Sequence, residues 1–329
     1  MSSRADQLPT FAGRLLLLLL CVVALVSCQR DDTPLRIASH VWLGYEPMFL
    51  SRSLGWLDPR HVELVETDTA AASLLALVEG QVDGAALTLD EVLMARAQGL
   101  DLVVVLVFNV SVGADAILAR PPAAGLQDMA GQRVGVELGT VGHLLLLLAL
   151  EEAELEWSAI EVVNLTVAQQ MAAQSSGGVD WLVSYEPTAT RLRQAGWVEV
   201  FNSSQIPGYI VDVLAVRRDR LTGARPDQLR HLVAAHFRGL EHLHRNPGDA
   251  SFRMSRRLGL LPGDVLPAYR GLVLPDETNN RLMLQADASA LDDAYARLLA
   301  FKQSQGLLVD YQAMGELHND RYLPRASAR

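Results

Sequence analysis

Acidic residues occupy positions of this sequence where they could form a binding site. Asp115 and Asp212 interrupt two apolar, strand-like runs, GADAILAR at 113–120 and IVDVLAVRR at 210–218. A carboxylate in such a run is costly to bury unless it is paired or hydrogen-bonded. Its partner would be an arginine, a group of backbone N–H donors or a cationic ligand. Three more acids directly follow strand-like runs, namely Glu46, Glu137 and Glu186.

So many carboxylates favour a ligand with a cationic group. A site built only for nitrate or a bare sulfonate would gain little from them. We therefore lean towards an amine, amidine or aminopyrimidine group, including zwitterionic ligands, with pairing to arginine as the alternative for each acid. Trp42 and Tyr45 flank Gly44, and they could stack on a planar or cationic group or belong to the core.

Two sequence features mark helix starts that could contact a ligand. Tyr-Glu-Pro occurs at 45–47 and again at 185–187, each time between an apolar run and a helix-like pattern. Proline near a first helical turn is favourable, so both copies could be plain turns, could face a ligand, or both. Thr140 follows Gly139 and opens a strongly apolar helix. Free N–H groups there would bind an anion, or Thr140 would simply be an N-cap.

The elements that position these residues alternate between strand and helix patterns. This alternation with short connections predicts parallel sheets covered by helices, an α/β class. The first set has strands at 35–39, 62–66, 82–87 and 102–108 and helices at 45–54, 70–79 and 89–98. The second has strands at 133–137, 162–166 and 179–184 and helices at 140–153, 168–175 and 187–195.

Two crossings between these sets predict two lobes around a cleft. Lobe one would contain residues 35–112 and 218–329, lobe two residues 120–208, and the hinge strands would be 113–119 and 209–217. Ligands bind beyond the carboxyl ends of strands in open α/β sheets, so both Tyr-Glu-Pro segments would face the cleft. The end of the chain would be helical, at about 227–245, 249–258 and 286–304.

The N-terminus indicates export and membrane anchoring. Arg4 and Arg14 precede the apolar run 15–26, which is too short to span a bilayer, since about 20 residues are needed. Leu25-Val26-Ser27-Cys28 resembles the bacterial lipoprotein box, which implies a signal peptide at 1–27, lipid on Cys28 and a tether at 28–34. An ordinary signal peptide is the alternative. Cys21 would leave with the signal, so the mature chain would have no disulfide and no cysteine nucleophile.

Several function classes are disfavoured by composition. The formal net charge is −10 and no basic stripe is present, which argues against nucleic acid as a partner. The histidines have no metal-site spacing: His231 and His236 do not share a helix face, and His242 and His244 lie on opposite sides. We expect no metal, no cofactor and no catalytic residue.

Six segments together resemble the periplasmic substrate-binding proteins of ABC importers, in the branch of nitrate, taurine, aliphatic-sulfonate and pyrimidine-precursor binders. They are HVWLGYEPMFLSRSLGWL at 40–57, EGQVDGAAL at 79–87, VSVGADAILA at 110–119, MAGQRVGVELGTVGHLLLLLALEEAEL at 129–155, VDWLVSYEPTATRLRQAG at 179–196 and IPGYIVDVLAVRR at 206–218. The resemblance implies a type II binding-protein fold, a monomer, and ligand delivery to an ABC permease and its ATPase. It also implies ligand contact near Gly139, Thr140 and Val141.

The location would be the periplasmic face of a bacterial membrane, either inner or outer. A ligand-sensing subunit of a membrane receptor is an alternative with the same fold. A thiamin-pyrimidine synthase-like enzyme is less favoured, because Lys302 lies in the helical C-terminal region and no cysteine-rich motif is present. The candidate ligand-binding residues are Trp42, Gly44, Tyr45, Glu46, Thr88, Gly113, Asp115, Glu137, Gly139, Thr140, Val141, Tyr185, Glu186 and Asp212.

Overall fold

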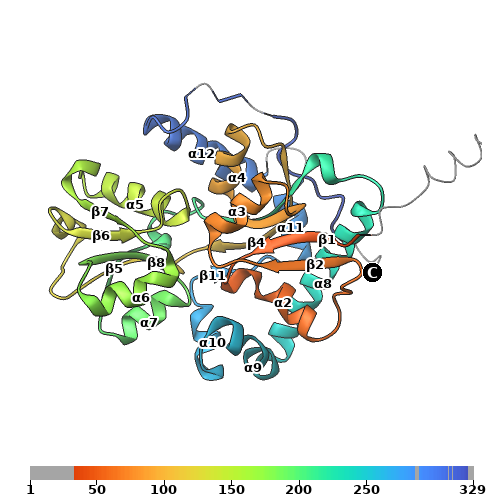
Figure 1. Ribbon diagram of the computed structural model, residues 1–329, viewed down its shortest axis with the longest axis horizontal. Coiled ribbons are helices and arrows are strands. Elements are labelled where there is room, and N and C mark those ends of the chain that lie inside the picture. The colour runs from red at the N-terminus through yellow and green to blue at the C-terminus, as the bar shows by residue number, and fades with distance from the viewer. Residues whose placement is uncertain (1–32, 286–288, 310, 313, 325–329) are drawn as a thin grey trace, which may run out of the picture. The chain divides into compact units, whose positions relative to one another are not determined.

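The computed structural model describes residues 33–285, 289–309, 311–312 and 314–324. The proposed signal peptide and Cys28 lie outside the described residues. The described residues from Pro34 onward belong to one compact unit, which contains two β-sheets with helices packed around each (Figure 1). No helix among the described residues is long and apolar enough to cross a membrane.

Sheet A contains six strands in the order β11-β4-β10-β3-β1-β2. β1, β2 and β3 run parallel, and β10 is antiparallel to both of its neighbours, β3 and β4. The bounds are β1 Leu35–Ser39, β2 Val62–Glu66, β3 Gly84–Thr88, β4 Leu102–Ser111, β10 Val211–Arg217 and β11 Leu272–Val273.

Sheet B contains five strands in the order β7-β6-β8-β5-β9. β6, β7 and β8 run parallel, and β5 is antiparallel to its neighbours β8 and β9. The two sheets therefore share one plan. Three parallel strands lie in the spatial order β2-β1-β3 in sheet A and β7-β6-β8 in sheet B, and an antiparallel strand, β10 or β5, pairs with the third of them. The bounds are β5 Asp115–Ala119, β6 Arg133–Val136, β7 Glu161–Asn164, β8 Trp181–Tyr185 and β9 Val198–Asn202.

The helices divide between the sheets (Figure 1). Those that pack with sheet B are α5 Val141–Glu152, α6 Val167–Ser176 and α7 Thr188–Gln194. Those associated with sheet A, directly or through a neighbouring helix, are α2 Glu46–Ser53, α3 Ala70–Val78, α4 Leu89–Ala97, α8 Arg225–Arg245, α9 Pro247–Leu258, α10 Pro262–Ala268, α11 Glu277–Met283 and α12 Ala290–Ser304. Short 3-10 helices lie at Leu43–Tyr45, Leu126–Met129, Trp157–Ala159, Ser203–Gln205 and Arg218–Arg220.

The predicted α/β class with a helical C-terminal region is confirmed, and most elements lie within two or three residues of their expected positions. The strand predicted at 82–87 begins at Gly84, where a close approach requires glycine, because a Cβ there would lie 2.8 Å from the Ala215 carbonyl oxygen. Strand β9 was not anticipated; it is an edge strand whose outer face stays partly exposed. The short β11 also interrupts the C-terminal region that was expected to be wholly helical.

The chain passes between the sheets at two places, and hydrogen bonds hold the first of them, near Gly113. At the first, the Val112 amide donates to the Gly271 carbonyl oxygen at 2.7 Å. The hydroxyl of Ser203 accepts from the Gly113 amide at 2.6 Å and lies 2.8 Å from the Ser111 hydroxyl. Residues 113 and 271 approach so closely that a Cβ at Gly271 would lie 2.7 Å from the Gly113 carbonyl carbon.

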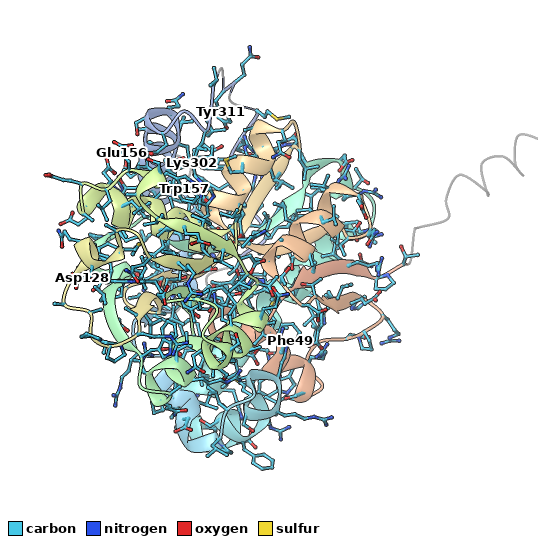
Figure 2. The ribbon with its side chains drawn as sticks, turned by 60° about the vertical axis from the view of Figure 1, so that its left-hand side comes forward. Phe49, Asp128, Glu156, Trp157, Lys302 and Tyr311 are labelled. Atoms are coloured by element: carbon cyan, nitrogen blue, oxygen red, sulfur yellow. The ribbon has the colours of Figure 1, made fainter. Side chains whose placement is uncertain are left out.

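A buried ion pair ties the C-terminal helix to α4. Lys302, the sole lysine of the chain, is 3% exposed, and its Nζ lies 2.8 Å from the carboxylate of Asp90. Lys302 is labelled in Figure 2. Because Asp90 belongs to the first turn of α4, this pair holds α4 at the helix start that faces the site described next.

Candidate ligand-binding site

A small cavity of about 10 Å³ lies between the two sheets. This space holds about one water molecule, so a small-molecule ligand would fit only if the two walls of the cavity moved apart. The cavity wall combines acidic, aromatic and small side chains from both sheets. The lining residues are His40, Trp42, Ala70, Thr88, Asp115, Val141, Tyr185 and Asp212.

The two aspartates occupy corresponding places in the two sheets. Asp212 in β10 lies opposite Thr88, the last residue of β3. Asp115 in β5 lies opposite Tyr185, the last residue of β8. In each sheet, therefore, the antiparallel strand starts where the third parallel strand ends, and the cavity lies at these carboxyl ends, as expected for an α/β sheet.

Asp212 has a hydrogen-bond donor at each carboxylate oxygen. The Tyr45 hydroxyl donates to one oxygen at 2.7 Å, and the Asn109 side-chain amide donates to the other at 2.8 Å. Asn109 in turn accepts from the Trp42 indole N–H at 3.0 Å. This chain of bonds explains Gly44, since a Cβ there would lie 1.7 Å from the Asn109 side-chain oxygen. In sheet A, two hydrogen bonds thus fix the position of the Asp212 carboxyl group.

Asp115 differs from Asp212, because one of its buried oxygens has no hydrogen-bond partner among the described residues. The side chain is 3% exposed. Burying a carboxylate oxygen without a donor costs free energy. Tyr185, opposite Asp115, packs edge-on against Trp42 at a ring-centroid distance of 5.4 Å. Sheet B thus presents a carboxylate with spare capacity beside two aromatic rings.

In this arrangement of the two sheets, burial favours the neutral, protonated form of the carboxyl groups at the site. Burial raises the pKa of Asp115 to about 7 and that of Glu91 to about 7. Burial, together with the Asp115 charge, raises the pKa of Asp212 well above its usual range. Burial lowers the pKa of His40 to about 3, so this ring is neutral. Burial is the largest cause of each shift, since a charged group loses its hydration there, and no arginine or lysine lines the cavity among the described residues.

The glutamates of the two Tyr-Glu-Pro segments are paired with arginines and do not line the cavity. Glu46 is 1% exposed and pairs with Arg257, whose guanidinium also lies 3.4 Å from the centroid of the Phe49 ring (Figure 2 labels Phe49). Glu186 is 2% exposed and pairs with Arg193. The tyrosines of the same segments lie at the site: Tyr185 lines the cavity, and Tyr45 does not line it but donates a hydrogen bond to Asp212.

The glycine-threonine junction before α5 contributes through its helix start. Val141, the first residue of α5, lines the cavity. The Thr140 hydroxyl donates to the Glu137 carbonyl oxygen at 2.9 Å and does not cap the helix. Gly139, with a φ of 81°, and Gly113, with a φ of 122°, provide turns next to the site and do not line it.

Three polar residues of the site were missed by the sequence analysis. His40 directly follows β1 and could have been found by the same strand-end argument as Glu46. Glu91 forms a capping box with Thr88, which the spacing Thr88-Leu89-Asp90-Glu91 signals. Asn109 lies within an apolar strand and gives no local signal of its role. The described residues contain no cluster of metal-ligating side chains.

Two named bacterial proteins are similar to this chain in sequence. The putative aliphatic sulfonates-binding protein of Escherichia coli (strain K12) is 31% identical over 168 residues, which cover 48% of this chain and 53% of that protein. The chain thus matches about half of that relative's length. The taurine-binding periplasmic protein of the same organism is 26% identical over 238 residues, covering 69% of this chain and 74% of that protein.

A solved structure shows the same fold. The alkanesulfonate-binding protein of Xanthomonas axonopodis pv. citri, bound to MOPS, superposes with a TM-score of 0.72 at 21% identity, covering 84% of this chain and 95% of that one. The family model described as NMT1/THI5 like matches residues 47–250, more than half of the chain. This chain therefore belongs to the NMT1/THI5-like family.

Proposed function

We propose that this protein is a lipid-anchored solute-binding protein that captures a small amine-bearing zwitterion and delivers it to an ABC permease and its ATPase. The observation that carries the proposal is the cavity with two aspartates and no lysine or arginine among its described lining residues. A cationic group would supply the donor that the free Asp115 oxygen lacks. It would also offset the repulsion between Asp115 and Asp212.

The start of α5 supplies a place for the anionic end of such a ligand. The amides of Val141 and Gly142 belong to the first turn, where backbone N–H groups have no partner within the helix. Their dipoles favour negative charge. Since Val141 lines the same cavity as Asp115 and Asp212, one small molecule could reach both ends.

The relatives support a compact zwitterion as the ligand class. Taurine, named for one relative, carries an amine and a sulfonate two carbons apart. MOPS, bound in the solved structure, carries a morpholine nitrogen and a sulfonate. Trp42 and Tyr185 are placed to pack beside an ammonium group, an interaction worth about 0.5–2 kcal/mol. Catalysis is not part of this proposal.

The ligand class is tested by thermal shift, because a ligand that binds only the folded state raises its stability. A panel of amine-bearing zwitterions is compared on the wild type and on Asp115→Asn. We expect at least one compound to raise the melting temperature of the wild type and to lose most of that effect on the variant. A panel in which only simple anions stabilise the wild type would contradict the proposal.

The anchor is tested separately. Cys28→Ala should abolish incorporation of labelled palmitate and release the protein from membranes, because the lipid on Cys28 would hold the protein through buried CH₂ groups. Absence of label in the wild type in its native host would show that Cys28 carries no lipid. The binding measurements use the released domain and do not depend on this result.

A further inference from the structure

An arginine joins a helix of one sheet to a helix of the other. Arg191 lies in α7, which packs on sheet B, and its guanidinium donates to two carbonyl oxygens at the end of α9. The acceptors are Leu258 at 2.7 Å and Gly259 at 2.9 Å. Since α9 packs with α2 and α8 on the sheet A side, this contact crosses between the two halves of the fold (Figure 1).

The end of α9 is a good acceptor for a cation. The last carbonyl groups of a helix have no partner within the helix, and they lie at the negative end of its dipole. The Nη2 nitrogen of Arg191 carries two hydrogens, so it can donate to both oxygens at once. Because the guanidinium is charged, such hydrogen bonds are stronger than those between neutral groups.

Glycine at position 259 makes room for this contact. Gly259 has a φ of 61°, the left-handed conformation that often ends a helix. A Cβ there would lie 2.5 Å from the Nη2 nitrogen of Arg191, so any other residue would push the guanidinium away. Gly177 ends α6 in the same conformation, with a φ of 72°, but nothing would lie within 4 Å of its Cβ. The two glycines therefore differ only in what a Cβ would displace.

Both partners of the contact lie close in sequence to the cavity wall. Helix α7 begins shortly after Tyr185, which lines the cavity. Arg257, the residue before Leu258, donates to the backbone carbonyl of His40 at 3.0 Å, and His40 also lines the cavity. The rings of His40 and Tyr185 face each other from the two sheets at a centroid distance of 6.0 Å. The hydrogen bonds of Arg191 thus link the segments that carry the two walls.

A ligand enters only when these walls separate, because the cavity holds about one water molecule. The chain crossings can act as hinges in such a motion. Neither Arg191 nor the end of α9 belongs to a crossing. When α7 moves with sheet B, its two hydrogen bonds to α9 break, while the backbone stays continuous at the crossings.

We propose that Arg191 is a latch, meaning a side chain that holds the two cavity walls together and so sets how often the site opens to a ligand. It is a positioning residue and does not line the cavity. The inference goes beyond the proposed function, since it concerns access to the site and holds whether or not the ligand carries an amine.

The test measures how often the cavity wall becomes accessible. Ala70 lines the cavity and is 2% exposed, so the thiol of an Ala70→Cys variant reacts with iodoacetamide only when the walls separate. The full chain also carries Cys21→Ser and Cys28→Ser, which remove its two native thiols. When closing is faster than labelling, the labelling rate follows the population of the open form. No ligand is added.

Arg191→Ala should raise the labelling rate at position 70 about three- to tenfold, the effect of losing charged hydrogen bonds at a half-exposed site. Arg256→Ala is the matched control, because Arg256 is an exposed residue of the last turn of α9 and carries the same charge. The control should label as its parent does.

A second thiol distinguishes separation of the walls from unfolding. Ala149 in α5 is fully buried, so Ala149→Cys reacts only when the fold opens. It should label far more slowly than Ala70→Cys, with and without Arg191→Ala. Equal rates at the two positions would show that position 70 reacts through unfolding, which would overturn the inference.

The inference is also overturned by an unchanged rate at position 70 in Arg191→Ala, or by an equal rise in Arg256→Ala. Labelling of the parent at the rate of a free thiol would likewise show that nothing holds the walls together. If Arg191→Ala fails to fold, the glycine pair decides: Gly259→Ala should speed labelling, and Gly177→Ala, with the same backbone strain, should not. Absence of an amine-bearing ligand would refute the ligand class and leave this result unaffected.

Discussion

The two halves of the site have the same arrangement of strands but differ in the hydrogen bonding of their aspartates. Each sheet supplies an aspartate opposite the last residue of its third parallel strand. In sheet A, Asp212 has donors on both oxygens, from Tyr45 and Asn109. In sheet B, Asp115 keeps an oxygen without a partner among the described residues. We infer that Asp212 of sheet A is already held in place without ligand, and that a ligand would supply the hydrogen-bond donor that Asp115 of sheet B lacks.

The two Tyr-Glu-Pro segments are alike in sequence but differ in their place in the fold. One lies after β1, the first strand of sheet A, and the other begins at the last residue of β8, the third parallel strand of sheet B. They therefore do not occupy corresponding places. What they share is a tyrosine directed to the site and a buried glutamate held by an arginine. The repeat reflects a common way to start a helix at a strand end.

Replacing the arginines that pair with Glu46 and Glu186 should give the largest loss of stability, and the loss should differ between the two Tyr-Glu-Pro segments. Arg257→Ala leaves Glu46 buried and unpaired, and breaking a buried pair costs about 3–5 kcal/mol. Arg193→Ala should cost less, since the Arg193 side chain is 36% exposed and the pair is partly screened. Urea unfolding at pH 8 measures both. Equal losses would show that the segments are energetically alike.

Asp115→Asn should give the largest effect on binding. If its carboxylate pairs with a cationic ligand group in the closed site, the variant should bind an amine-bearing ligand about 2–5 kcal/mol more weakly. The ligand-free protein should keep or gain stability, since a buried carboxyl is replaced by a neutral group of the same shape. Calorimetric titration and melting on the same sample separate the two effects. A variant that loses stability without ligand would place Asp115 in an internal pair.

Asp212→Asn should differ by affecting the ligand-free protein as well. If the new amide N–H faces Tyr45, the hydroxyl accepts from it and its own O–H loses its acceptor; if it faces Asn109, two N–H donors oppose each other. We expect a destabilisation of about 1–3 kcal/mol. Denaturant unfolding beside Asp115→Asn provides the matched comparison. If both variants unfold at the same denaturant concentration, the distinction between a completed and an incomplete half is wrong.

The differences in stability should also depend on pH. A carboxyl whose pKa is raised by burial stabilises the folded state below its unfolded pKa, and this stabilisation is lost as pH rises to the folded pKa. For Asp115 that window runs from about 4 to about 7. The melting temperature of Asp115→Asn relative to wild type should therefore increase between pH 4 and pH 7 and level off above. A difference that stays constant would show that Asp115 is not protonated in the closed site.

The sequence predicted the sheets better than it predicted the site. Continuous apolar runs predict the strands directly, because both faces of a parallel sheet are buried and so nearly every residue of a strand is apolar. The same runs also located Asp115 and Asp212, since a carboxylate is conspicuous among apolar neighbours. Six of the proposed site residues line the cavity together, namely Trp42, Thr88, Asp115, Val141, Tyr185 and Asp212.

What the sequence did not reveal was the partner of each acid. Glu46 and Arg257 are 211 positions apart, and no local pattern connects them. Asn109 supports Asp212 across 103 positions. Long-range pairing decides whether a buried acid is structural or available, and single-sequence patterns do not carry that information.

The most direct test of the central claim compares two molecules that differ by one amine. Taurine and ethanesulfonate share the sulfonate and the two-carbon chain, and ethanesulfonate lacks the cationic group. The first zwitterion found to stabilise the protein, with its own des-amino analogue, extends the comparison if taurine is not bound. Calorimetric titration of the wild type at pH 7 should show binding of the amine-bearing member and at least a hundredfold weaker binding of the other, since losing a buried charge pair costs several kcal/mol. Equal affinity for the two members of a pair would contradict the account, because Asp115 and Asp212 would then have no cation to recognise.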